Sequence, residues 1–172
     1  MSVQNRTVVL VACLSALAGA AVTAVAFRWV GSPVAGVSDR ADTIHEMGSH
    51  VMPFALNATT HVFEMTESGG IQDVVVKDPA DSAQIPLIRQ HLKHEAAMFG
   101  EGNFSDPMSL HGAHMPGVHE LSAAAGRVRV TYDTLPDGAR ITFSTDDPAL
   151  VTAVHRWFGA QLSDHGADAT YR

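Results

Sequence analysis

Histidine and methionine are the residues of this sequence whose types and spacing could bind a metal ion. All ten histidines and six of the seven methionines lie between His45 and His165, while the single cysteine, Cys13, precedes them. Imidazole is a ligand for copper, zinc, iron and nickel, and the methionine thioether selects Cu(I). Without a thiol after Cys13, blue-copper, iron–sulfur, covalent c-type haem and cysteine-based zinc sites are excluded.

A helix predicted from about Ala83 to Gly100 carries the first candidate ligands. Helical spacing places His91, His94 and Met98 within one stripe, beside the apolar stripe that should face the core. Two imidazoles and a thioether on one face can share a metal ion. The alternative is a polar flank with a methionine at the edge of the core.

The segment from Glu101 to Leu121 holds the densest group of candidate ligands: His111, His114, Met115 and His119. Its glycines and prolines predict that most of it forms no regular element, and a loop of this length is functional or disordered. Three of its apolar residues, Phe104, Leu110 and Val118, suggest that it packs. Mixed histidine and methionine ligands in an oxidising compartment favour copper, and the alternative is a surface loop without a ligand.

A second predicted helix, residues 146–165, places His155 at the edge of its inner face, as His91 lies in the first helix. If the two helices are related, these histidines could reach a common ligand. Axial histidine ligation of a non-covalent haem is therefore an alternative to copper. His165 lies near the end of this helix, where an imidazolium would interact favourably with the helix dipole.

A further group of candidate ligands follows the N-terminal region: His45, Met47, His50 and Met52. These residues could form a second loading site or a lid, or they could be disordered. His61 is a further candidate ligand, but it begins a predicted strand, where a single histidine usually has a structural role.

Two similar units follow one another along the sequence. Each contains two short runs of strand-forming residues joined by a turn and then a helix that follows an Asp-Pro pair. The predicted elements are strands 61–66 and 71–77 with helix 83–100, and strands 127–133 and 139–145 with helix 146–165. We therefore predict an α+β fold, a ββα–ββα pseudo-repeat with an antiparallel sheet and both helices on one face.

The run from Thr7 to Phe27 contains no charged residue. About 20 apolar residues in a helix span a bilayer, so residues 1–28 are predicted to be a transmembrane anchor. Residues 29–44 would be a linker and residues 45–172 a single extracytoplasmic domain in a single-pass membrane protein. Alternatively, cleavage near Ala26 would release a secreted or periplasmic protein.

The net charge of the exported part indicates which classes of partner it can bind. All 18 acidic residues lie beyond Arg28, against nine of the eleven Lys and Arg, since Arg6 and Arg28 precede them. The exported part therefore carries about −9, which argues against nucleic acid and anionic lipid surfaces and favours cations.

The sequence lacks the common catalytic signatures. It contains no His-Glu-x-x-His, no Gly-x-Ser-x-Gly, no P-loop and no dinucleotide fingerprint. Glu95, Asp106 and Glu120 could act as bases, but no residue pattern selects a substrate. A binding role is favoured over catalysis.

Several stretches between Met47 and Ala169 resemble a small bacterial family whose members often carry the label aspartate carbamoyltransferase. The stretches are 86–95, 103–107, 111–117 and 155–166. The resemblance supplies a grouping and no activity, because the Ser-Thr-Arg-Thr carbamoyl-phosphate loop of that enzyme is missing. The nearest string is Ser144–Asp147.

The sequence thus predicts a membrane-tethered extracytoplasmic protein that binds, buffers or delivers copper. Its expected core ligands are His91, His94, His111, Met115 and His155. Zinc is an alternative metal, and haem iron an alternative cofactor. A third possibility is a non-metal accessory or sensor module whose histidines titrate near neutral pH.

Overall fold

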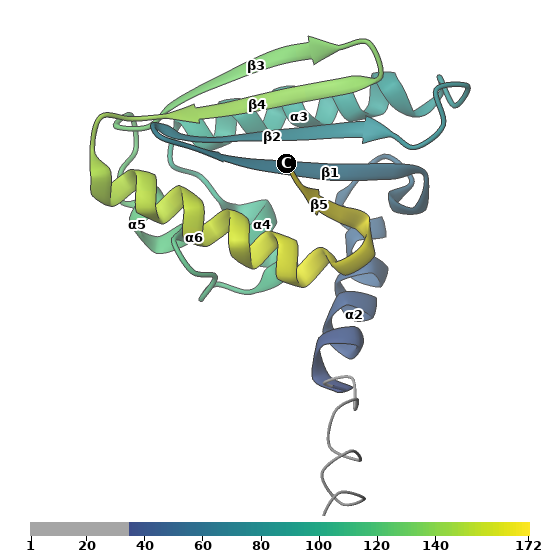
Figure 1. Ribbon diagram of the computed structural model, residues 1–172, viewed down its shortest axis with the longest axis horizontal. Coiled ribbons are helices and arrows are strands. Elements are labelled where there is room, and N and C mark those ends of the chain that lie inside the picture. Colours follow the sequence, from purple (N-terminus) through teal and green to yellow (C-terminus); the bar gives the residue numbers. More distant parts are fainter. Residues whose placement is uncertain (1–34) are drawn as a thin grey trace, which may run out of the picture. The chain divides into compact units, whose positions relative to one another are not determined.

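The computed structural model describes residues 35–172 and shows an α+β fold (Figure 1), which confirms the predicted class. The apolar segment from Thr7 to Phe27, predicted to anchor the chain, lies outside the described residues. Among residues 35–172, no helix is both long and apolar enough to cross a bilayer.

Five strands form one mixed sheet in the order β3-β4-β2-β1-β5. Their bounds are β1 Thr59–Thr66, β2 Gly69–Val76, β3 Arg129–Leu135, β4 Gly138–Ser144 and β5 Ala169–Tyr171. Neighbouring strands run antiparallel, except that β5 runs parallel to β1. The prediction of a purely antiparallel sheet is therefore wrong at β5, a three-residue strand too short to show an alternating pattern in the sequence.

The two faces of the sheet differ in polarity because successive side chains point to opposite sides. Phe63, Ile141 and Phe143 on the inner face are at most 1% exposed. On the opposite face, Arg140 donates to both carboxylate oxygens of Asp73. One face is therefore available for packing, as in many antiparallel sheets.

Two long helices cover the inner face, α3 Gln84–Gly100 and α6 Pro148–His165. The Asp147 side chain caps α6 by accepting a hydrogen bond from the Ala149 backbone N–H. Trp157 of α6 packs edge-to-face on Phe143 of the sheet and on Phe99 of α3, with ring centroids 5.4 and 5.3 Å apart. This aromatic group joins both helices to the sheet.

The elements follow one another as β1-β2-α3 and then, after two short helices, as β3-β4-α6. Each of these strands and helices begins and ends within about two residues of its predicted bounds. The proposed origin of this order in an internal duplication stays a prediction.

The segment from Glu101 to Leu121 is more regular than the sequence predicts, and the expectation of an irregular loop is wrong for much of it. It contains α4 Ser105–His111 and α5 Val118–Ser122. These helices are too short to produce a detectable apolar period. The predicted packing is confirmed, because Phe104, Leu110 and Val118 are at most 4% exposed.

Helix α2, Ala35–Val51, occupies part of the segment 29–44 that the sequence predicts as a linker. From Ala35 onward that segment is helical and is continuous with the residues after it. Ile44 is buried at 3% exposure, so α2 packs against the rest of the domain.

Gly117 is required by a close approach between the start of α5 and α6. Its φ is 85°, and a Cβ there would lie 2.1 Å from the Ala153 carbonyl oxygen. Gly126 also has a positive φ, 75°, but no heavy atom lies within 4 Å of its Cβ position. We expect Gly126→Ala to lower the free energy of unfolding by about 1 kcal/mol. Gly117→Ala should cost at least about 2 kcal/mol more in urea titrations. Equal effects would contradict the close approach.

Candidate functional site

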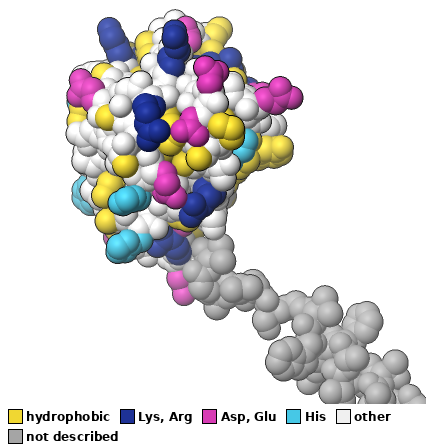
Figure 2. Space-filling view, turned by 90° about the vertical axis from the view of Figure 1, so that its left-hand side faces the viewer, with side chains coloured by type: hydrophobic (Ala, Val, Ile, Leu, Met, Phe, Trp, Pro, Cys, Tyr) yellow, Lys and Arg dark blue, Asp and Glu magenta, His cyan; other side chains and the backbone are white. Residues whose placement is uncertain are grey.

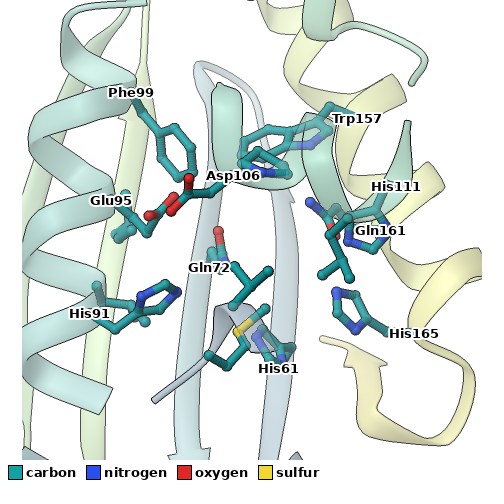
Figure 3. A pocket seen from close by; sticks show the side chains of 16 residues that line it. His61, Gln72, His91, Glu95, Phe99, Asp106, His111, Trp157, Gln161 and His165 are labelled. Carbon is teal, nitrogen blue, oxygen red and sulfur yellow. The ribbon is translucent and has the colours of Figure 1, made fainter. Parts of the chain in front are cut away.

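A cavity of about 40 Å³ lies between α3, α6 and the inner face of the sheet (Figure 3). Helix α4 and the residues that follow α2 complete its wall. Its polar and titratable lining residues are His61, Gln72, His91, Glu95, Asp106, His111, Trp157, Gln161 and His165. A buried water needs roughly 10–15 Å³ of such space, so the cavity has room for a few waters or for a hydrated ion.

Four buried side-chain atoms in the described part of the chain have no hydrogen-bond partner within the protein, and all four belong to this cavity. They are His61 Nδ1, Gln72 Oε1, Glu95 Oε1 and Trp157 Nε1. Each unsatisfied buried polar group costs about 1–3 kcal/mol. Their convergence from β1, β2, α3 and α6 on one cavity indicates that its contents are polar.

A pair of carboxyl groups forms one side of the cavity. Glu95 of α3 is 6% exposed, and Asp106 of α4 lies beside it (Figure 3). Burial, followed by a hydrogen bond and charge repulsion from Asp106, raises the pKa of Glu95 to about 8. Glu95 is therefore protonated at neutral pH, and the two side chains can share this proton.

His94 joins the carboxyl pair from the exposed side of α3. One potential ligand atom from each of His94, Glu95 and Asp106 lies within 4.8 Å of the others. In the part of the chain that the structure describes, no other group of three His, Cys, Asp or Glu side chains meets this distance. One turn of α3 away, His91 lines the cavity, and burial lowers its pKa.

Three histidines from β1, α4 and α6 form the opposite side of the cavity, and we call them the histidine wall. The rings of His61 and His165 are stacked, with centroids 4.8 Å apart and planes 14° from parallel. His111 meets His165 edge-on, with a centroid distance of 4.9 Å. Burial lowers the pKa of all three, that of His165 to about 4, so the wall is neutral at pH 7.

The stacking decides what the histidine wall can bind. A metal ion lies close to the plane of each imidazole that ligates it, about 2 Å from the nitrogen. Because the His61 and His165 planes are nearly parallel and stacked, both rings cannot bind one ion without reorientation. In the observed arrangement, the histidine wall can donate and accept hydrogen bonds.

Asp164 is hydrogen-bonded to the histidine wall through His111. It accepts a hydrogen bond from Nδ1 of His111, 3.1 Å away, and both of its oxygens accept from Arg40 of α2. Burial alone would raise the pKa of Asp164, but hydrogen bonds from Arg40 and His111 outweigh it and lower the pKa. The ionised carboxylate fixes the Nδ1–H tautomer of His111, an arrangement common behind functional histidines.

No protein-family model matches this chain. No curated protein and no solved structure matches it either. The functional argument therefore depends on the geometry of the cavity.

The structure brings only part of the predicted ligand set together. His91, His94 and His111 lie at or beside the cavity. His155 does not line it, because its Nε2 donates to the carbonyl oxygens of Thr66 and Gly69 at the β1–β2 turn. The haem alternative required His91 and His155 to bind one iron, but only His91 lines the cavity. The cavity of about 40 Å³ is also far smaller than the roughly 300 Å³ that sites for organic ligands usually exceed, so the geometry does not favour haem.

The other predicted ligands of α3 and of the segment after it lie apart from the cavity. Met98 is half-buried, Met115 is buried in the apolar core, and His114 and His119 are exposed. Figure 2 shows histidine side chains at the surface among interspersed acidic and basic groups. The sequence could not separate these exposed histidines from His111, which is three residues from His114.

The group near α2 is also divided. Met52 lines the cavity, and Nδ1 of His45 lies 2.5 Å from Asp168 Oδ2. Met47 and His50 are exposed. His61, for which a structural role was favoured over metal binding, is 2% exposed and belongs to the histidine wall.

Sequence reasoning missed His165 as a cavity residue and assigned it only to the helix end. A signal was present, because Trp157, Gln161 and His165 follow one another at four-residue intervals along the inner face of α6. Gln72 and Asp164 carried no comparable signal.

Proposed function

We propose that this domain binds a divalent transition-metal ion through His94, Glu95 and Asp106. The observation that carries the proposal is Glu95. Its Oε1 is buried without a hydrogen-bond partner, and one of its carboxylate oxygens lies within 4.8 Å of ligand atoms on the other two residues. A proton held between two carboxyl groups can be replaced by a cation, and the adjacent imidazole supplies a nitrogen ligand. His91 lies one turn away as a further candidate ligand.

The ligand types bear on the identity of the metal. Carboxylate oxygen and imidazole nitrogen suit Cu(II) and Zn(II), whereas Cu(I) prefers thioether ligands, and Met98 is not part of this group. Divalent copper has the highest affinity in the first-row series for such sites. Copper therefore remains the first candidate in its divalent state, and zinc the second.

Three protein ligands support a role in metal exchange. Structural zinc sites usually have four protein ligands, whereas three ligands leave a position open to water or to a partner's ligand. An open position suits buffering or delivery of the ion. The proposed location outside the cytoplasm depends on the apolar run from Thr7 to Phe27.

Metal titration of the full-length chain in detergent tests this proposal. We expect one equivalent of Cu(II) or Zn(II) to bind with Kd below about 1 μM, and His94→Ala or Asp106→Asn to weaken binding at least about tenfold. His119→Ala is the matched control, because it removes an exposed imidazole outside the group. Binding no tighter than micromolar, or equal losses in His119→Ala and His94→Ala, would exclude this site.

A second candidate function is a proton-responsive module without metal. The observation that favours it is the histidine wall, in which neutral imidazoles lie in ring contact and burial lowers their pKa values. Protonation of one imidazole disfavours protonation of its neighbours, so acid favours a state in which the ring contacts are broken. A structural transition in mild acid that is unchanged by chelators would favour this function over metal binding.

A further inference from the structure

Helix α2 forms part of the cavity wall through its C-terminal end. Val51, its last residue, and Met52, which follows, both line the cavity. Ile44 is its only buried large apolar side chain among residues 39–51, at 3% exposure. Residues of β1, β2, β4, α3, α4 and α6 enclose the other sides of the cavity (Figure 3).

Two side-chain contacts fasten α2 to the C-terminal end of α6 and the turn that follows. Arg40 donates to both carboxylate oxygens of Asp164, and His45 lies 2.5 Å from Asp168. Arg40 and His45 are near the surface, with side chains 50% and 48% exposed. Because both contacts are partly exposed and α2 buries one large apolar side chain among residues 39–51, α2 is held less firmly than the core elements.

The aspartate that binds Arg40 also contacts the histidine wall. Asp164 accepts from Nδ1 of His111, and Arg40 also donates to the His111 carbonyl oxygen, 3.0 Å away. The Arg40–Asp164 contact that fastens α2 therefore also orients His111 of the histidine wall.

We propose that α2 is the gate of the cavity, and that it opens by separating from the end of α6 while the sheet, α3 and α6 remain folded. Elements with few buried apolar contacts open at lower free energy than the whole domain unfolds. Separation at Arg40 would withdraw the wall formed by Val51 and Met52. Asp164 and the His111 carbonyl group would also lose their hydrogen bonds from Arg40. Because it concerns access to the cavity, the gate does not depend on a metal ion.

Chemical modification of the cavity histidines tests the gate in the metal-free, full-length chain. Diethyl pyrocarbonate acylates unprotonated imidazole nitrogen and is too large for a cavity of about 40 Å³. The rate of its reaction with His61 and His165 therefore measures opening of the cavity. The rate at exposed His119 measures the intrinsic reactivity of the reagent and serves as the reference. We expect Arg40→Gln to accelerate modification of the two cavity histidines about threefold to tenfold relative to His119, as read by mass spectrometry.

Arg156→Gln is the matched control. Arg156 pairs with Glu120 at 2.9 Å, and their side chains are 55% and 45% exposed, but neither residue lines the cavity. This variant also removes an arginine–carboxylate pair, one that is more exposed than that of Arg40, and its cavity histidines should be modified at the wild-type rate. Equal acceleration in both arginine variants, or none in Arg40→Gln, would overturn the proposal.

Hydrogen exchange distinguishes local opening from unfolding. In Arg40→Gln we expect faster exchange in peptides from α2 and unchanged exchange in β1 and β2. A rise of the same size in every element would show that the cavity opens by global unfolding and would also overturn the gate. If Arg40→Gln does not fold, Arg40→Lys, which keeps the charge but loses bidentate geometry, provides the same comparison.

Discussion

The affinity of the domain for Cu(II) or Zn(II) is expected to fall about tenfold from pH 9 to pH 7. The reason is Glu95, whose pKa is raised to about 8 by burial and by Asp106. A metal ion must displace the proton of this carboxyl group before it can bind. Below the pKa of Glu95, each further pH unit costs about tenfold in affinity from this group, and above pH 9 the affinity should level off.

Glu95→Gln isolates this effect because glutamine keeps the size of the side chain and does not ionise. We expect its affinity at pH 9 to be at least about tenfold lower than that of the wild type, with no tenfold change between pH 9 and pH 7. Chelator competition at several pH values measures both quantities. A wild-type affinity that is flat over this range would contradict the protonated carboxyl pair. So would a Glu95→Gln variant with the wild-type slope.

The second large effect is expected in the acid stability of the domain and arises from His165. Burial, followed by the charge of His111, lowers the pKa of this imidazole from 6.5 to about 4 in the folded state. Between these pH values the unfolded chain binds a proton that the folded chain does not. The stability from this group is fully present above pH 6.5, is lost as the pH falls toward 4, and amounts to about 3 kcal/mol.

Comparison with His165→Gln separates this term from the other titrating groups. Glu95 acts in the opposite sense, because its raised pKa favours the folded state below pH 8, so the wild-type pH profile alone mixes the two. We expect the unfolding free energy of the wild type, relative to His165→Gln, to fall by about 3 kcal/mol from pH 7 to pH 4 in urea titrations. A difference that stays constant would show that His165 is already protonated, or accessible to water, in the folded protein.

Local patterns predicted most of the fold. Alternation of apolar residues located the two strand pairs, and Asp-Pro pairs with helical periods located α3 and α6, because these signals arise between residues close in sequence. Local signals failed for the two short helices between the units and for the last strand. Helices α4 and α5 and strand β5 are too short to show a period, and their positions depend on what they pack against.

The candidate site was predicted less completely than the fold. Helical spacing alone placed His91 and His94 on neighbouring positions of α3, and both lie at the carboxyl side of the cavity. Equivalence with the second unit suggested His155, but this histidine binds the carbonyl groups of the β1–β2 turn. Corresponding positions in the two units therefore have different surroundings: His91 lines the cavity and His155 does not.

By itself, the sequence determined that the chain combines an N-terminal uncharged segment with an acidic α+β domain that has no thiol and many imidazoles. Those properties follow from composition and from local spacing. Only the tertiary structure decided which imidazoles face a common cavity. His61, His111 and His165 are distant in the sequence, and they meet because β1, α4 and the end of α6 converge on the same part of the sheet. The pKa of Glu95 was decided in the same way, since burial and the approach of Asp106 from α4 exist only in the folded chain.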